Sequence, residues 1–264
     1  MSTGNEITGL HAAAVGTSKP AADLPVIYDS NRPSLSLILR SHGYEVVDLG
    51  IVSDTVAATR QALQLGAERA DIVITTGGTS MGEGDLLKPV IERELGGTVH
   101  FGRVAMKPGK PTTFATFSSA HPSPSSSKMK QDTLVFALPG NPASALVTFH
   151  LFVLPCLRKM SGYPLLGSLE SGRGWHLPTV RVRVTTDMRL DPRPEFHRVW
   201  IEPDREGDGS CLVARSTGGQ RSSRTVSLAG ANGLVCLPSS KKEGAKDVKA
   251  GDIVDAILMG ALGV

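Results

Sequence analysis

The sequence predicts an α/β domain followed by a small β-domain, and two observations carry this prediction. In the first half, short apolar runs rich in β-branched residues alternate with helix-like stretches, which is the pattern of a sheet layered by helices. In the second half, short alternating runs are separated by Gly, Pro and Asp turns, which indicates a barrel or a sandwich. We place the two domains at residues 1–165 and 175–260.

The elements of the first domain follow from periodicity and capping residues. Strands are predicted at residues 25–28, 45–49, 71–75, 99–106, 112–117 and 133–138, with a hairpin between the fourth and the fifth. Helices are predicted at residues 33–42, from a cap at Asp54 to residue 70, and through residues 86–91. Pro142 suits the first turn of a long apolar helix that ends near Met160.

The second domain is expected after residues 162–175, which carry several Gly and Ser residues. Its strands are predicted at residues 180–184, 196–201, 211–213, 233–237 and 253–258. The Ser- and Pro-rich residues 118–127 lie inside the first domain and indicate a surface loop.

Composition favours a globular protein with small anionic ligands. The 264 residues are 40% hydrophobic, and the formal charge of +3 comes from scattered Lys and Arg, so we expect no nucleic-acid or membrane partner. Three cysteines without metal-ligand spacing fit a reducing cytosolic location. The most apolar stretch, residues 145–157, is too short to span a bilayer and predicts a buried core helix. We find no signal peptide at the start of the sequence.

The most informative motif is residues 75–85, TTGGTSMGEGD, which joins a strand to a helix. Glycines such as Gly77 and Gly78 let backbone amides approach a phosphate, and Ser80 follows them. Glu83 and Asp85 are hard oxygen ligands that suit Mg²⁺ held between protein and substrate phosphates. The alternative is a tight turn in which Asp85 only caps the next helix.

Two further motifs are candidates for anion binding. Lys107 and Lys110 lie in the sequence KPGKP, where two prolines stiffen the loop, and preorganised ammonium groups suit a tetrahedral oxyanion. The alternative is a hairpin turn with two solvated lysines. Residues 138–144, LPGNPAS, form a strand-to-helix junction whose free helix amides would point at an anion. If the strands before Gly77 and Pro139 are parallel neighbours, both loops meet at one crevice; otherwise the junction is an ordinary helix start.

The second half offers weaker signals. Residues 191–198 and 216–224 concentrate guanidinium and hydroxyl groups, and arginine binds oxyanions in a bidentate way, although such segments are more often charged turns. His197 is a lone histidine for which the sequence shows no partner. No Ser/His/Asp or Cys/His arrangement follows from spacing, so a hydrolase has little support.

Six motifs in order give the chain a family resemblance. They are STGNEI at residues 2–7, YDSNRP at 28–33, GGTSMGE at 77–83, MKPGKP at 106–111, LPGNP at 138–142 and DPRPE at 191–195. Together with a gephyrin-like stretch at residues 216–232, they resemble the molybdopterin molybdenumtransferase family, which includes bacterial MoeA and the E domain of gephyrin. The resemblance covers essentially the whole chain.

The resemblance implies a fold and an activity. The fold would be a MogA-like three-layer pterin-binding domain followed by a small C-terminal β-barrel. Such proteins take adenylylated molybdopterin and molybdate, release AMP with Mg²⁺ assistance and yield molybdenum cofactor. Asp85 would be the essential acidic residue near Mg²⁺ and the pyrophosphate, with Glu83 beside it. The substrate-binding residues would be Gly77, Gly78, Ser80, Lys107, Lys110, Pro139, Pro142, Ser144, one of Arg193 and Arg198, and one of Ser222 and Ser223.

The chain also departs from the family pattern. Met1 falls inside the first strand of the pterin-binding domain, and the two preceding domains are absent, so the sequence suggests a truncated chain with weakened Mg²⁺ and nucleotide binding and poor catalysis. Family members are homodimers whose crevice borrows residues from the partner subunit. Two alternatives remain: a molybdopterin adenylyltransferase, whose MogA-type domain shares a Gly-Gly loop with acidic residues, and a non-catalytic gephyrin-like scaffold.

Overall fold

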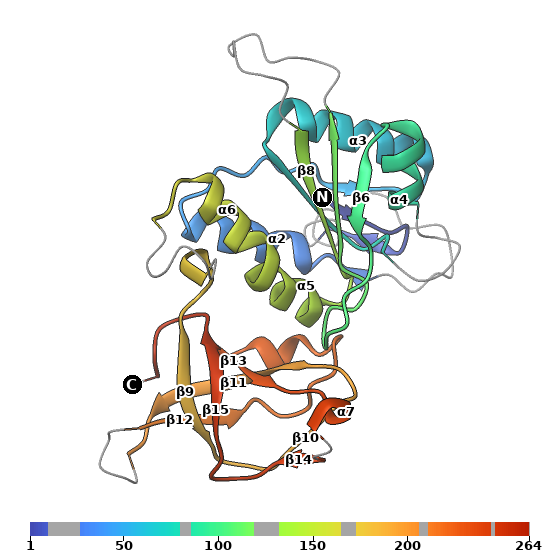
Figure 1. The fold of residues 1–264 in the computed structure, drawn as a ribbon. Helices are drawn as coiled ribbons and strands as arrows, with labels where there is room; N and C mark the ends of the chain where they lie inside the picture. Colours follow the sequence, from blue (N-terminus) through green and yellow to red (C-terminus); the bar gives the residue numbers. More distant parts are fainter. Residues whose placement is uncertain are drawn as a thin grey trace. The chain divides into compact units, whose positions relative to one another are not determined.

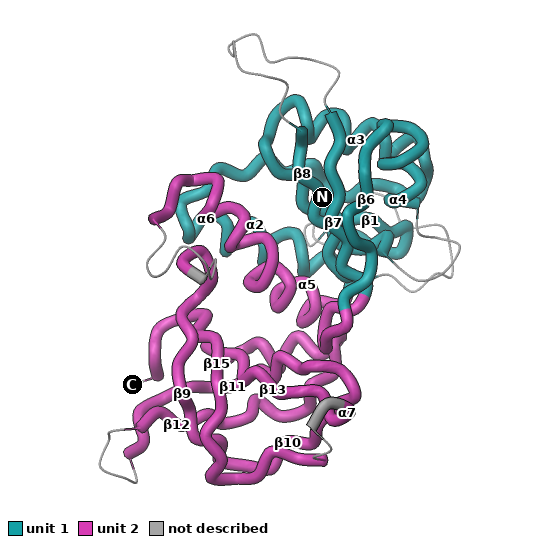
Figure 2. The backbone as a smooth tube through the Cα atoms, in the orientation of Figure 1, with its two compact units in different colours: residues 1–104, 111–140 teal, residues 105–110, 141–264 magenta. Residues whose placement is uncertain are grey.

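The computed structural model describes residues 1–9, 27–79, 86–118, 132–164, 173–205, 211–243 and 246–263. The chain forms two compact units (Figure 2). The first unit contains Met1–Val104 and Pro111–Gly140, and the second contains Ala105–Lys110 and Asn141–Val264. Our division of the chain at residues 165–175 remains a prediction.

The first unit is built on a six-stranded mixed sheet (Figure 1). Across the sheet the strands are β4 (Ile51–Val52), β1 (Ser2–Thr3), β5 (Ile72–Thr76), β8 (Asp132–Leu138), β7 (Thr113–Ser118) and β6 (Thr98–Phe101). The first four are parallel, whereas β7 and β6 are antiparallel to their neighbours. A separate pair joins β2 (Ile7–Thr8) to β3 (Ile27–Tyr28).

Helices of the first unit bury apolar side chains against this sheet. The helices are α2 (Asn31–Ser41), α3 (Val56–Arg69) and α4 (Leu87–Pro89), which continues as the π-turn η1 (Val90–Glu94). Leu63 of α3 and Ile91 of η1 are fully buried and pack with Val73 of β5, Ala115 of β7 and Val135 of β8. Burial of such side chains stabilises the sheet that carries the loops described below.

Several element boundaries differ from the sequence prediction. Residues 45–49 form no strand, because β1 takes Ile51 and Val52 as its partners instead. The cap of α3 is Thr55, whose hydroxyl accepts the amide of Ala58, whereas the Asp54 carboxylate accepts the amide of Asn5. The hairpin between β6 and β7 is confirmed, but β6 ends at Phe101, so the connection is longer than predicted. The predicted loop at residues 118–127 lies almost wholly outside the described residues.

The second unit begins with the predicted apolar helix. It runs as α5 (Pro142–Thr148), the π-turn η2 (Phe149–Val153) and α6 (Leu154–Met160). Pro155 lacks the N–H that would bond four residues back, and the helix widens in the turn before it. Among the described residues this helix has the length and composition to cross a membrane, but half of its apolar window is buried, and core helices pass the same test.

A closed five-stranded barrel follows. Its strands, in order around the barrel, are β11 (Glu195–Pro203), β12 (Leu212–Ser216), β9 (Thr179–Val184), β15 (Ile253–Leu258) and β13 (Gly233–Leu237). Short elements complete the unit: η4 (Arg173–Trp175), η5 (Thr225–Leu228), α7 (Ser240–Glu243) and the pair β10 (Met188–Arg189) with β14 (Asp247–Val248). Inward side chains such as Val182, Ile201 and Val235 are at most 1% exposed and form the core. The second domain is therefore a barrel and not a sandwich.

Candidate functional site

The first candidate site lies in the first unit, where two parallel strands end. β5 and β8 are parallel neighbours, and Thr76 pairs with Leu138. The strands before Gly77 and Pro139 are therefore parallel neighbours, which was the condition for the two loops to meet. The loops that start at Gly77 and Pro139 therefore leave the same edge of the sheet. They also touch, because the amide of Gly77 donates to the carbonyl of Leu138 over 3.3 Å.

Only glycine fits the first loop. Gly77 and Gly78 have φ of 84° and 63°, a region that L side chains rarely adopt. A Cβ on Gly77 would stand 2.4 Å from the carbonyl oxygen of Thr3, and one on Gly78 would stand 2.8 Å from the Thr3 hydroxyl. The loop is thus pressed against β1, and its glycines leave the backbone bare, as a phosphate-binding loop requires.

A buried polar network borders the same edge of the sheet. The Ser2 hydroxyl donates to Asp29 over 3.0 Å and lies 3.1 Å from the Thr76 hydroxyl. Arg32 forms an ion pair with Asp29 over 2.8 Å. Burial alone would lower the pKa of the Arg32 guanidinium, but the hydrogen bond and charge of Asp29, together with Asp48, raise it. This network fixes the STGNEI and YDSNRP segments against the sheet.

The second loop is tied to α2. The side-chain amide of Asn31 donates to the carbonyl of Gly140 over 2.7 Å, and Pro139 is buried. A cavity of about 100 Å³ lies elsewhere in this unit, between α2, residues 45–49 and β5. Its lining is mainly apolar, and the guanidinium of Arg32 at its rim is already paired, so we do not assign the phosphate to it.

The predicted metal ligands lie outside the described residues. Ser80, Glu83 and Asp85 all fall in residues 80–85, for which the structure gives no placement. In the described part of the chain, no group of three or more His, Cys, Asp or Glu side chains could hold a metal ion. The assignment of Glu83 and Asp85 as Mg²⁺ ligands therefore stays a prediction from the sequence.

A separate candidate site surrounds Lys107 in the second unit. Its amide donates to the carbonyl of Pro194, and its carbonyl accepts from Phe196. Its ammonium group lies 3.0 Å from a carboxylate oxygen of Glu195 and 3.4 Å from one of Asp191. A hydrogen bond and the charge of Arg193 lower the pKa of Asp191 to about 2, so this carboxylate is ionised at neutral pH. Lys107 and Arg193 are thus brought together by Asp191, with which both form ion pairs.

Arg198 organises the next loop and does not face the same carboxylates. Its side chain is fully buried, its Nε donates to the Ser227 hydroxyl over 2.8 Å, and one terminal nitrogen donates to the carbonyl of Arg221. The backbone of Arg198 also bonds to Gln220 and Thr217. Its other terminal nitrogen, Nη1, is buried and has no hydrogen-bond partner. Burial lowers the pKa of this guanidinium, although the charge of Glu195 opposes that effect.

The loop held by Arg198 reaches the start of α5. The carbonyl of Ser222 accepts the amide of Ala143, and its hydroxyl accepts the side-chain amide of Asn141 over 3.1 Å. Ser222, rather than Ser223, therefore contacts the helix start that carries Pro142 and Ser144. The remaining predicted residues divide by exposure: Ser144 is buried, Pro142 is partly buried, and Lys110 and Ser223 are exposed.

The sequence analysis missed part of this cluster. His197 does have partners: its Nδ1 lies 3.3 Å from Glu195, and its Nε2 lies 2.8 Å from the Ser216 hydroxyl. The prediction that it lacks a partner was therefore wrong. One signal was present, because Glu195 and His197 are two apart on a strand and share a face. The contacts with Lys107 and Ser216 are long-range and left no signal in the sequence.

Comparison with protein families defines the class of the chain. Residues 1–159 match the model described as a probable molybdopterin binding domain, and residues 181–259 match the MoeA C-terminal region (domain IV). The fold is therefore a MogA-like α/β domain joined to a MoeA-type β-barrel, as the sequence predicted. The chain belongs to the molybdopterin molybdenumtransferase family, together with MoeA and the E domain of gephyrin.

Individual relatives agree with this assignment. The chain is 41% identical to gephyrin of Dictyostelium discoideum over 99% of its own length and 36% of that protein. It is 34% identical to the molybdopterin molybdenumtransferase of Nostoc sp. PCC 7120, covering 80% of the chain and 44% of the relative. The molybdopterin biosynthesis MoeA protein of Pyrococcus horikoshii superposes with a TM-score of 0.67 at 27% identity, covering 98% of the chain and 53% of that structure. The chain thus spans less than half the length of these curated relatives.

The close approach of Gly77 to β1 predicts a sharp difference between two glycine variants. Gly43 has almost the same φ, 83°, but nothing lies within 4 Å of a Cβ built there. Gly43→Ala should therefore lower the free energy of unfolding by about 1 kcal/mol, from backbone strain alone. Gly77→Ala should cost at least about 2 kcal/mol, because the Thr3 carbonyl must also move. Urea unfolding followed by circular dichroism measures both; equal losses would contradict the close approach.

Proposed function

We propose that this chain performs the pterin- and molybdate-binding part of molybdenum insertion, in which molybdate joins the dithiolene of adenylylated molybdopterin and AMP is released. The observation that carries the proposal is the Lys107 ammonium, which backbone hydrogen bonds fix on the barrel beside a second basic residue, Arg193. The names of the relatives support it, since three of them are molybdopterin molybdenumtransferase, gephyrin and a molybdenum cofactor synthesis protein.

In the first unit, the glycine loop is suited to the pyrophosphate of the adenylylated pterin. The glycine turn lets a phosphate approach the backbone at the carboxyl end of β5, where the amide of Gly78 and those that follow would donate to its oxygens, since the Gly77 amide already bonds to Leu138. The neighbouring Pro139–Gly140 segment, anchored by Asn31, limits how far the loop can move. These residues would orient the nucleotide end of the substrate and leave its reactive anhydride at the loop.

Magnesium would be held by Asp85 and Glu83 together with phosphate oxygens of the substrate. When bound there, the ion neutralises charge that develops on the phosphates as AMP departs. The role of the chain is to supply two carboxylates immediately after the glycine turn. In the proposal, the metal ligands and the phosphate-binding amides would belong to one segment of the sequence, residues 77–85.

In the second unit, cationic and polar groups suit a tetrahedral oxyanion. The Lys107 ammonium is a fixed donor, Lys110 is an exposed cation on the same loop, and Ser222 lies at the start of α5 with Ser144 in its first turn. Arg193 supports Lys107 by holding Asp191. Preorganised donors of this kind stabilise an oxyanion better than mobile surface lysines do.

Two competing functions are less well supported. An adenylyltransferase would need only the MogA-type domain, and the match of residues 181–259 to the MoeA C-terminal region favours the insertase. A gephyrin-like scaffold rests on the name of one relative, and no described contact favours it. A cytosolic location and a homodimeric assembly belong to the same proposal and await direct measurement.

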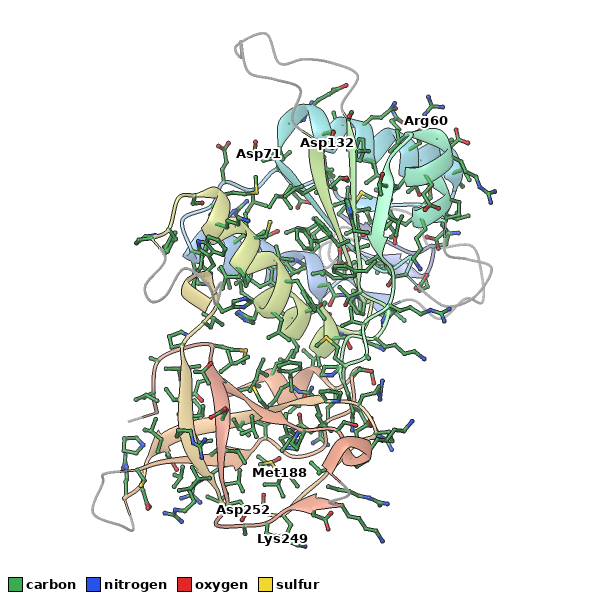
Figure 3. All side chains as sticks on the ribbon, viewed as in Figure 1. Arg60, Asp71, Asp132, Met188, Lys249 and Asp252 are labelled. Carbon is green, nitrogen blue, oxygen red and sulfur yellow. The ribbon has the colours of Figure 1, made fainter. Side chains whose placement is uncertain are left out.

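Removal of the Lys107 charge should impair the use of molybdate. Lys107→Ala should raise the molybdate concentration for half-maximal AMP release by about 10- to 100-fold, the loss expected for one charge-assisted hydrogen bond. Lys249→Ala is the matched control: Lys249 also pairs with carboxylates, Asp187 and Asp247, but it lies after β14 and forms no ion pair with the carboxylates that surround Lys107. Figure 3 shows Lys249 beside Asp252 at the edge of the second unit. Equal molybdate dependence in all three proteins would overturn the oxyanion role.

Asp85→Asn tests the metal site. Binding of adenylylated molybdopterin to the wild-type chain should weaken at least about tenfold when Mg²⁺ is chelated, whereas Asp85→Asn should bind weakly with or without the ion. Asp71→Asn is the control, because Asp71 comes just before β5, at the end of the strand away from the glycine loop (Figure 3). Fluorescence titration measures the affinities. If the wild-type chain binds adenylylated molybdopterin equally well with and without Mg²⁺, the proposed metal site is wrong.

A further inference from the structure

Two cations and two carboxylates face one another around Lys107 before any anion arrives, and the charge of the buried Arg198 guanidinium also acts on Glu195 without forming an ion pair with it. Lys107 and Arg193 supply two positive charges, and Asp191 and Glu195 supply two negative charges within ion-pair distance. A dianion that binds the Lys107 ammonium therefore competes directly with Glu195. The Glu195 side chain is only 3% exposed, so it cannot turn to water when its cation is shared. A buried carboxylate that loses part of its counter-charge is strongly disfavoured.

His197 is the ionisable group that lies close enough to Glu195 to replace the positive charge of Lys107. Its Nδ1 lies 3.3 Å from the second carboxylate oxygen of Glu195, the oxygen that does not face Lys107. Its side chain is 12% exposed, so solvent protons can still reach it. Glu195 thus bridges the ammonium group and the imidazole, with one oxygen for each.

The hydrogen bonds of Ser216 define the uncharged form of this imidazole. The Ser216 hydroxyl oxygen accepts the amide of Gly218 over 3.1 Å and lies 2.8 Å from Nε2 of His197. The hydroxyl proton can donate to Nε2 of the neutral imidazole, whose own proton then lies on Nδ1 facing Glu195, and the second lone pair of the hydroxyl oxygen can accept from Nε2 of the imidazolium. Protonation at Nε2 needs only rotation of that hydroxyl.

The other ionisable groups near His197 do not take its place. Burial alone would raise the pKa of Glu195, but hydrogen bonds from His197 and Lys107 outweigh burial and lower it, so Glu195 stays ionised. Arg198 follows on β11 and directs its side chain to Ser227 and Arg221. On β13, Cys236 stands opposite Phe196, and burial together with the charge of Asp255 raises the pKa of its thiol to about 11.

We propose that binding of a dianionic tetrahedral oxyanion at Lys107 is coupled to protonation of His197 through Glu195. The inference rests on the proposed function for the identity of the anion, molybdate. As the anion draws the ammonium away from Glu195, the imidazolium replaces it as the counter-charge. The chemistry gives this proton a use: exchange of one molybdate oxygen for two dithiolate sulfurs releases that oxygen as water and consumes two protons. One proton would arrive with the anion, and the second would come from solvent.

Calorimetry tests the coupling without turnover. Sodium molybdate is titrated into the intact chain at about pH 7.5, where free imidazole is mostly neutral, in buffers that differ in ionisation enthalpy. The slope of binding heat against buffer enthalpy gives the protons taken up, and we expect about one per anion. His197→Gln should abolish the uptake and weaken binding about tenfold. His176→Gln, which removes an exposed imidazole from the same unit, should behave as the wild type.

A second variant separates the coupling from a structural role. Glu195→Gln removes the buried charge, so proton uptake should disappear while molybdate affinity is kept or increased. A purely structural role for the pair predicts weaker binding in both variants, and thermal melting checks that each is folded. Lys107-dependent binding without buffer-dependent heat, or uptake unchanged in His197→Gln, overturns the coupling alone. Absence of molybdate binding, or binding unchanged in Lys107→Ala, overturns the proposed oxyanion site and the coupling with it.

Discussion

Two backbone hydrogen bonds at Lys107 decide which groups surround its ammonium. Its amide donates to the Pro194 carbonyl over 2.9 Å, and its carbonyl accepts the Phe196 amide over 2.8 Å, so the loop lies beside the first residue of β11. Because Glu195 stands between those two partners, its carboxylate meets the ammonium group, and His197 follows on the same face of the strand. The charge balance, the place for an oxyanion and the coupling to a proton all depend on this pairing.

In the first unit the corresponding constraint is the parallel pairing of β5 with β8. It brings the glycine loop and the Pro139–Gly140 segment to one edge of the sheet, and the contact of Gly77 with Thr3 excludes any larger residue there. Glycine thus fits against β1, and the absence of a side chain would let a phosphate approach the backbone. In the proposed function, the first unit presents backbone to phosphates, and the second presents fixed cations to an oxyanion.

Local signals in the sequence were enough to predict much of this arrangement. Alternation of apolar residues predicted the sheet and the barrel strands, and Pro142 marked the start of its helix. The short strand β4 escaped prediction, because its position depends on pairing with β1 and not on its own pattern. Glu195 and His197 escaped as site residues for a similar reason: their partners lie on loops distant in sequence, and only folding brings them together.

The most direct test of the account is to locate the oxyanion itself. Tungstate has the charge and shape of molybdate and scatters X-rays strongly at its absorption edge, so a crystal of the chain soaked in sodium tungstate would reveal its position. The account predicts an anomalous peak whose oxygens lie within hydrogen-bond reach of the Lys107 ammonium, about 2.7–3.2 Å away. An ordered peak elsewhere, with Lys107 still bound to Glu195 and Asp191 alone, would contradict it.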